Sequence, residues 1–159
     1  MKNSIKKGLG FGLTSGIITT LGLMIGLYAS TNSSKIILGG IIIIAIADAL
    51  SDSLGMHISE EANSANSKEQ IWEATLSTFL FKFIFALIFI IPILLLNLQT
   101  AIIVSIILGI FLITIFSYYI AKSNKDSPIK AIIEHLFITV IVIITTYFIG
   151  KFINSIFGI

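Results

Sequence analysis

The sequence predicts an all-α polytopic membrane protein, with five transmembrane helices in a single domain over residues 1–159. Of the 159 residues, 56% are hydrophobic and only 11% are charged, whereas a soluble domain carries about 25% charged residues. The mean hydropathy is +1.05, and several apolar runs reach the roughly 20 residues that a spanning helix needs. The isoleucine-rich runs are too long for strands and lack the period-two alternation of a half-buried sheet.

Polar turns separate the apolar runs and give the expected order of elements. We expect helices at residues 9–30, 36–61, 69–96, 100–121 and 130–157. The turns are STNSSK, a polar linker over residues 62–68, NLQT and SNKDSP, and Pro128 suits the start of the last helix. The first run follows a basic start, but it is longer than a usual signal-peptide core and lacks an A-x-A site. We therefore expect it to be retained as a helix.

The basic residues are all lysines, and their distribution predicts the orientation. With the N-terminus in the cytoplasm, the inside segments contain Lys2, Lys6, Lys7, Lys68, Lys122, Lys125 and Lys130. Only Lys35 and Lys151 then lie outside, which is the positive-inside pattern. An odd number of spans places the C-terminus outside, and the compact Ile- and Lys-rich chain favours a prokaryotic plasma membrane. Lys82 is the exception, because it must project from the bilayer, snorkel or pair with an acid.

Composition and motifs exclude several classes of function. The chain has no cysteine, so it has neither a disulfide framework nor a thiolate metal site. The lysines lie in loops rather than on one basic face, which argues against a nucleic-acid partner. The sequence has no P-loop, nucleophile elbow, HExxH or haem motif. We therefore expect no enzyme and no bound cofactor.

The second expected helix contains two carboxylates within its span. Asp48, Asp52 and Met56 follow one another at four-residue spacing, so they share one slowly rotating face of the helix. Intramembrane carboxylates are costly and usually face a bundle interior, a partner or water. Two carboxylates and a thioether suit a divalent transition metal. The candidate metal ligands are therefore Asp48, Asp52, Met56 and Glu60. Alternatively, the two aspartates pair with Lys82, and Met56 only fills space.

More acids surround the short linker that follows this helix. They are Glu60, Glu61, Glu69 and Glu73. These acids form either a vestibule that concentrates cations or a solvated helix end, and Glu61 is a further candidate ligand. His57 points about 100° away from Met56, so we expect it to be interfacial or hydrogen-bonded rather than a ligand.

The first expected helix lacks carboxylates and instead carries glycines at four-residue spacing. Gly8, Gly12 and Gly16 form this row. Small residues at this spacing allow two helices to approach closely in lipid. We expect the row to form the contact of a homodimer.

Two segments resemble parts of a known transporter family. GLTSGIITTLGLMIGL followed by GGIIIIAIADALSDSLGMHISEEA resembles the first two helices of the vacuolar iron transporter family, and KAIIEHLFITVIVIITTYFIGKF is similar to its last helix. The resemblance implies a homodimer that moves Fe²⁺, and often Mn²⁺, out of the cytosol in exchange for protons. The implied pathway runs between the subunits along helices 1 and 2. Asp48 then corresponds to the family's helix-2 acid, and Met56 to its helix-2 methionine.

The chain departs from the family pattern at two places. Ser15 stands where the family has a helix-1 aspartate, so Ser15 is a further candidate for the metal path, and Asp52 is a candidate to replace the lost charge. The cytosolic metal-binding domain is reduced to the short linker.

Three functional readings therefore stay open. The first is a divalent metal transporter that works by alternating access with proton exchange. The second is a non-transporting membrane scaffold or accessory subunit, and the third is a transporter of another cation or of protons alone. Acids that face a shared cavity favour the first and third readings. Acids satisfied by a lysine within one subunit favour the second.

Overall fold

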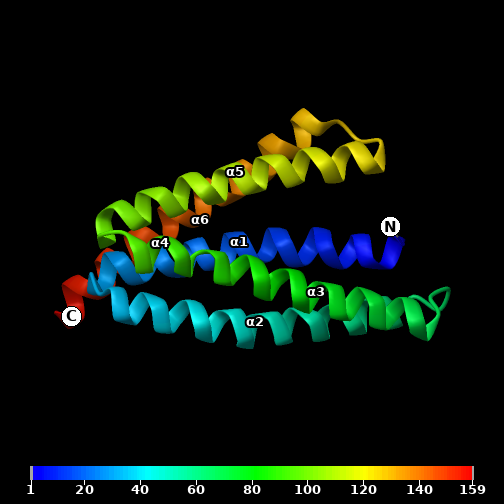
Figure 1. Cartoon of the computed structure of the whole chain (residues 1–159), viewed down its shortest axis with the longest axis horizontal. Helices are drawn as coiled ribbons and strands as arrows, with labels where there is room; N and C mark the ends of the chain where they lie inside the picture. The colour runs from blue at the N-terminus through cyan, green and yellow to red at the C-terminus, as the bar shows by residue number, and fades with distance from the viewer. Residues whose placement is uncertain (1, 159) are drawn as a thin grey trace.

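The computed structural model describes residues 2–158, and it is helical throughout apart from short connections. The helices are α1 (Asn3–Thr31), α2 (Ser34–Glu61), α3 (Lys68–Ile88), α4 (Ile90–Leu95), α5 (Leu98–Asn124) and α6 (Pro128–Phe157). With α3 and α4 taken as one stretch, five helical segments within residues 2–158 are long and apolar enough to cross a membrane. The two ends of the chain lie at opposite ends of the bundle (Figure 1), as an odd number of spans requires.

The observed helices match the predicted ones within a few residues except at two places. The first helix begins at Asn3 rather than residue 9, because its first turns extend beyond the apolar run and bond to α3. The predicted helix 69–96 is interrupted at Phe89, between α3 and α4. Pro92 explains the break, since it has no N–H and its ring clashes with the carbonyl of Ile88, four residues earlier. The Phe89 N–H bonds Ala86 O at 3.3 Å instead.

Capping residues make the connections between helices short. Asn32 ends α1 in the left-handed region (φ 48°), where its N–H bonds the carbonyl of Tyr28. Ser33 follows directly and caps α2. The Asn97 side chain accepts the Thr100 N–H at 3.0 Å and starts α5. Such tight turns force consecutive spans to run antiparallel.

Helix α1 lies at the centre of the bundle, with α2 and α3 on one side and α5 and α6 on the other (Figure 1). Its side chains Leu13, Ile17 and Leu21 are fully buried. A Cβ on Gly12 would lie 2.5 Å from Thr78 O, and a Cβ on Gly16 would meet the α3 backbone as well. The glycine row therefore packs α1 onto α3 of the same subunit. The prediction that this row forms a dimer contact is wrong for these positions.

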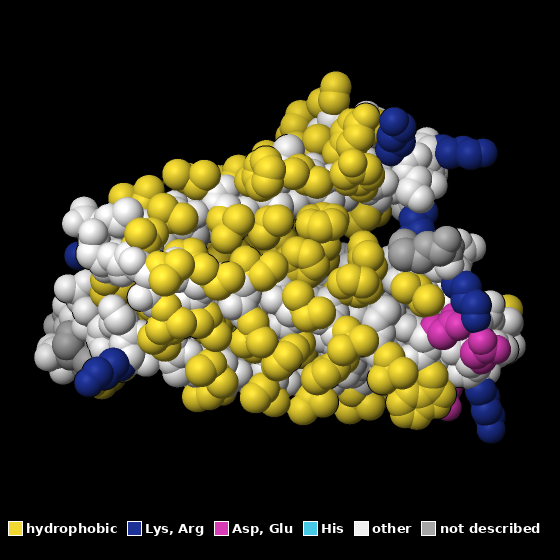
Figure 2. All heavy atoms as spheres, viewed as in Figure 1, with side chains coloured by type: hydrophobic (Ala, Val, Ile, Leu, Met, Phe, Trp, Pro, Cys, Tyr) yellow, Lys and Arg dark blue, Asp and Glu magenta, His cyan; other side chains and the backbone are white. Residues whose placement is uncertain are grey.

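An apolar surface surrounds the middle of the molecule. Figure 2 shows hydrophobic side chains over most of the visible face, while charged side chains gather near the ends. On α2 the exposed residues include Ile43, Leu50 and Leu54, at 55–68% exposure. A continuous exposed apolar surface of this kind indicates contact with lipid. The chain is therefore an integral membrane protein.

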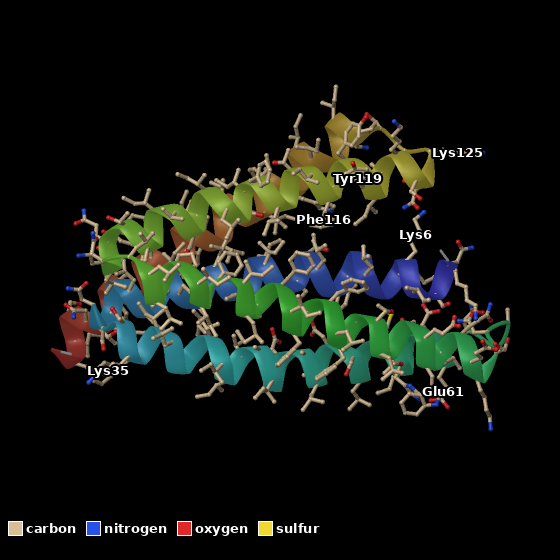
Figure 3. All side chains as sticks on the ribbon, viewed as in Figure 1. Lys6, Lys35, Glu61, Phe116, Tyr119 and Lys125 are labelled. Atoms are coloured by element: carbon tan, nitrogen blue, oxygen red, sulfur yellow. The ribbon has the colours of Figure 1, made fainter. Side chains whose placement is uncertain are left out.

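The charged residues at the two ends differ in number. Figure 3 places Lys6, Lys125 and Glu61 at one end of the bundle and Lys35 at the other. The end with the chain's N-terminus also carries the two linkers predicted to be cytoplasmic, 62–67 and 125–127. The side of the membrane that each end faces stays a prediction from the lysine distribution.

Candidate functional site

A buried lysine joins the two helix-2 carboxylates to α1. Lys82 Nζ lies 2.6 Å from Asp48 Oδ2 and is also paired with Asp52 Oδ2. The same ammonium donates to Ser15 Oγ at 2.9 Å, and the Ser15 hydroxyl donates to Asp52 Oδ2 at 2.7 Å. Residues from α1, α2 and α3 thus form one polar group, here termed the Lys82 cluster: Ser15, Asp48, Asp52 and Lys82.

The Lys82 cluster lies near mid-span in each of its helices. Lys82 is 14 residues from the start of the Lys68–Leu95 span, which is about 21 Å along the helix axis. Small residues bring the helices close enough for these contacts. Ala45 and Ala49 are fully buried on α2, and Gly16 leaves room for the Lys82 stem, whose Cγ would lie 3.3 Å from an added Cβ. The sequence therefore places charge where only a partner charge makes it tolerable.

The carboxylates lie nearer the surface than the ammonium does. The Lys82 side chain is 2% exposed, whereas those of Asp48 and Asp52 are 29% and 22% exposed. Two carboxylates and one ammonium give the cluster a formal charge of −1. The two aspartates are also held differently, because Asp52 accepts hydrogen bonds from Lys82 and Ser15. Asp48 Oδ2 is close to Lys82 only as an ion pair and accepts no hydrogen bond from residues 2–158.

The other predicted ligands do not join this group. Glu60 is 8% exposed, and both its carboxylate oxygens lie 2.9 Å from Lys7 Nζ. Glu60 also accepts from the side chain of Asn66 in the linker at 2.9 Å. Glu61 is exposed at the end of α2, and Met56 is half-buried one turn beyond Asp52. Among residues 2–158, no three His, Asp or Glu side chains come together as a metal-binding group. The predicted four-residue set is therefore not assembled within one subunit.

Lysines near the N-terminus neutralise most of the proposed acidic vestibule. Lys2 Nζ lies 2.8 Å from Glu69 Oε1 and also pairs with Glu73. The Ser4 hydroxyl donates to the other Glu73 oxygen at 2.5 Å. The hydrogen bonds to Glu69 and then Glu73 raise the pKa of Lys2 above its ordinary value. These contacts fasten the start of α1 to α3 and favour a structural role for these acids.

His57 is hydrogen-bonded, which is one of the two roles expected for it. Its Nδ1 lies 3.0 Å from Thr75 Oγ1, and its ring packs edge-on against Trp72 at a centroid distance of 4.8 Å. Both contacts run from α2 to α3, so His57 strengthens the same interface that holds the Lys82 cluster.

The sequence indicates Lys82 as a partner for the two aspartates, but it does not indicate the contact between Lys82 and Ser15. The available signal was a single lysine in the otherwise apolar run FLFKFIF. An ionisable residue at mid-span calls for a nearby partner, and Ser15 is the polar residue of α1 that faces it.

Comparison with known proteins supports one family. The family model described as the VIT family matches residues 52–151, well over half of the chain. The matched range includes Asp52 and Lys82 but not Ser15 or Asp48. A search of curated proteins finds no match. Members of the family are transporters rather than enzymes, and membership points to metal-ion transport across a membrane. With its five potential spans and this match, the chain belongs to the VIT family, the vacuolar iron transporters.

Proposed function

We propose that this protein transports a divalent transition-metal cation, Fe²⁺ or Mn²⁺, with Asp48 and Asp52 as the carboxylates that bind it. The observation that carries the proposal is the placement of these acids. Asp48 lies at the middle of α2 and Asp52 one turn further along, and both remain partly exposed on a face that their own subunit does not close. Ionisable residues inside a membrane span commonly mark an ion pathway, and Lys82 leaves the pair with one negative charge in excess. Met56, one turn further along, adds a soft sulfur that favours transition metals over Mg²⁺ or Ca²⁺.

A homodimer completes the pathway in this proposal. Next to the carboxylate face, α1, α2 and α6 border an apolar hollow of about 470 Å³, lined in part by Gly22, Gly26, Ile44 and Thr146. A second subunit seated along α1 and α2 would bring two copies of Asp48 and Asp52 toward one axis. Alternating access at that axis, with protons competing for the same carboxylates, would export the metal from the cytosol. The lysine-rich end, with the N-terminus, is the cytoplasmic side in this scheme.

Metal flux into liposomes that contain the purified protein tests the proposal. We expect flux of Fe²⁺ and Mn²⁺ to exceed that of Mg²⁺ and Ca²⁺. Asp48→Asn and Asp52→Asn should abolish flux, because each keeps the side-chain size but removes charge. Glu61→Gln, an acid on the same helix outside the cluster, is the matched control and should transport like the parent. Parent-like flux in both Asn variants would refute the proposal.

A non-transporting scaffold or accessory subunit is the second candidate, and one observation favours it. Lys82 forms ion pairs with both aspartates within a single subunit, which is the arrangement expected if the acids only hold helices together. Absence of flux for each of the tested divalent cations, from protein shown to be folded and dimeric, would favour this candidate.

A further inference from the structure

Lys82 occupies the position between the two carboxylates that a transported cation needs. Its ammonium is within 2.6 Å of Asp48 Oδ2, is paired with Asp52, and lies 2.9 Å from the Ser15 hydroxyl. Three oxygens from two helices thus surround one positive charge. A divalent metal ion at the same position would be coordinated by the same kind of oxygen atoms.

The ammonium has no alternative position in water. Lys82 is 2% exposed and lies about 20 Å of helix from either end of its span, which is far beyond the reach of its own stem. Leaving the charge without oxygens inside the bundle would be strongly unfavourable, because a buried charge without a partner is not compensated for its lost hydration. Lys82 therefore stays paired with the two carboxylates unless another cation replaces it there. After such a replacement, the Ser15 hydroxyl is the hydrogen-bond acceptor that the ammonium can keep.

A metal ion and Lys82 cannot use the same carboxylate oxygens together. Two positive charges a few ångströms apart in a site of low dielectric repel each other strongly. The carboxylates, with one charge more than the ammonium, still attract a divalent ion. Asp48 is held by Lys82 alone within the described chain, whereas Asp52 is also held by Ser15, so we expect the Asp48 contact to break first.

We propose that Lys82 is a tethered cation that fills the carboxylate pair when metal is absent, so that metal binding is an exchange of one cation for another. This inference rests on the proposed function and identifies Lys82 as the residue that sets affinity. The apparent dissociation constant equals the intrinsic one divided by the fraction of protein in which Lys82 has left the carboxylates. That fraction is the same for every cation. Lys82 therefore weakens binding of all cations equally, while Met56 determines preference among them.

Equilibrium titration with Mn²⁺ at one fixed pH tests the exchange, using the full chain in lipid nanodiscs. Lys82→Met should bind Mn²⁺ at least about tenfold more tightly than the parent. A tenfold difference means that Lys82 has left the carboxylates in about a tenth of the parent molecules. Lys82→Arg keeps the charge and should bind no more tightly than the parent. Mn²⁺ should also raise the melting temperature of Lys82→Met by more than that of the parent. A lysine that serves to hold the two carboxylates in their metal-binding geometry predicts weaker binding on its removal.

A second pair of variants tests the exchange even if Lys82→Met misfolds because its two carboxylates lack a counter-charge. In the Asp52→Asn background the cluster is formally neutral, and adding Lys82→Met restores one negative charge. The double variant should therefore bind Mn²⁺ more tightly than Asp52→Asn alone. Unchanged or weaker binding on removal of Lys82 in both backgrounds overturns the exchange. If the parent still shows flux that needs Asp48 and Asp52, only the exchange fails. If neither the parent nor Lys82→Met binds Mn²⁺ or Fe²⁺, the exchange and the proposed function both fail.

Discussion

Adding one methyl group to Gly12 should separate α1 from α3 and destabilise the subunit. A Cβ at this position would lie 2.5 Å from Thr78 O, 3.1 Å from Thr78 Cα and 3.2 Å from the Lys82 backbone nitrogen. All three atoms belong to the α3 backbone, so no side-chain rotation relieves the overlap. Inserting a methyl group into a packed interface costs about 1–3 kcal/mol. The gain in helix propensity from Gly to Ala offsets at most about 1 kcal/mol of that cost. The overlap with rigid backbone places the cost in the upper part of that range, at about 2–3 kcal/mol, so we expect Gly12→Ala to lower the free energy of unfolding by about 1–2 kcal/mol.

Denaturant unfolding in detergent, followed by circular dichroism, measures the effect, and Gly39→Ala is the matched control. A Cβ on Gly39 meets nothing within 4 Å, so that variant should gain about 0.5–1 kcal/mol from helix propensity alone. The opposite signs of the two substitutions test packing rather than composition. If Gly12→Ala were as stable as the parent but lost its dimer, the glycine row would face another subunit, and the packing described above would be refuted.

Three further predictions concern charge and topology. Asp48→Asn should unfold no more easily than the parent. Asp52→Asn should be less stable than Asp48→Asn by about 1–3 kcal/mol, because it loses charged hydrogen bonds. Equal stabilities of the two variants in thermal unfolding would contradict the difference in hydrogen bonding between Asp48 and Asp52. Reporter fusions after Lys125 and at the C-terminus should report opposite sides of the membrane, and the same side for both would refute five spans. Lys2, whose pKa is raised, keeps its proton and its ion pairs to higher pH than an ordinary lysine. An amine-reactive reagent at alkaline pH should therefore modify Lys2 more slowly than Lys125, as peptide mass spectrometry would show.

The number and order of spans were predictable because their signals are local. Apolar length and polar turns act within one segment, and caps such as Ser67 and Asn97 stand directly beside the helices that they start. The break at Phe89 was missed although Pro92 is visible in the sequence. Proline is tolerated in membrane helices, so its presence alone does not decide between a kink and an interruption.

The candidate site was predictable only up to the choice of partner. Helical spacing placed Asp48 and Asp52 on one face, but that spacing does not say what the face meets. The rotation of α3 brings Lys82 to them, and that rotation follows from backbone contacts at Gly12 and Gly16. Glu60 shows the same limit, because helical spacing set it beside the face that carries Asp48 and Asp52, while its ion pair with Lys7 depends on where α1 begins.

Ser15 connects the departure from the family pattern with the presence of Lys82. The resemblance places an aspartate where Ser15 stands, and a third carboxylate there would give the cluster a formal charge of −2. A hydroxyl keeps both contacts, since it accepts from Lys82 and donates to Asp52, which a carboxylate cannot do for Asp52. With Ser15, one lysine and two carboxylates form a nearly balanced group that is stable without metal. Under the proposed function, the absence of a helix-1 acid and the presence of the Lys82 ammonium would both lower the affinity of the cluster for a metal ion.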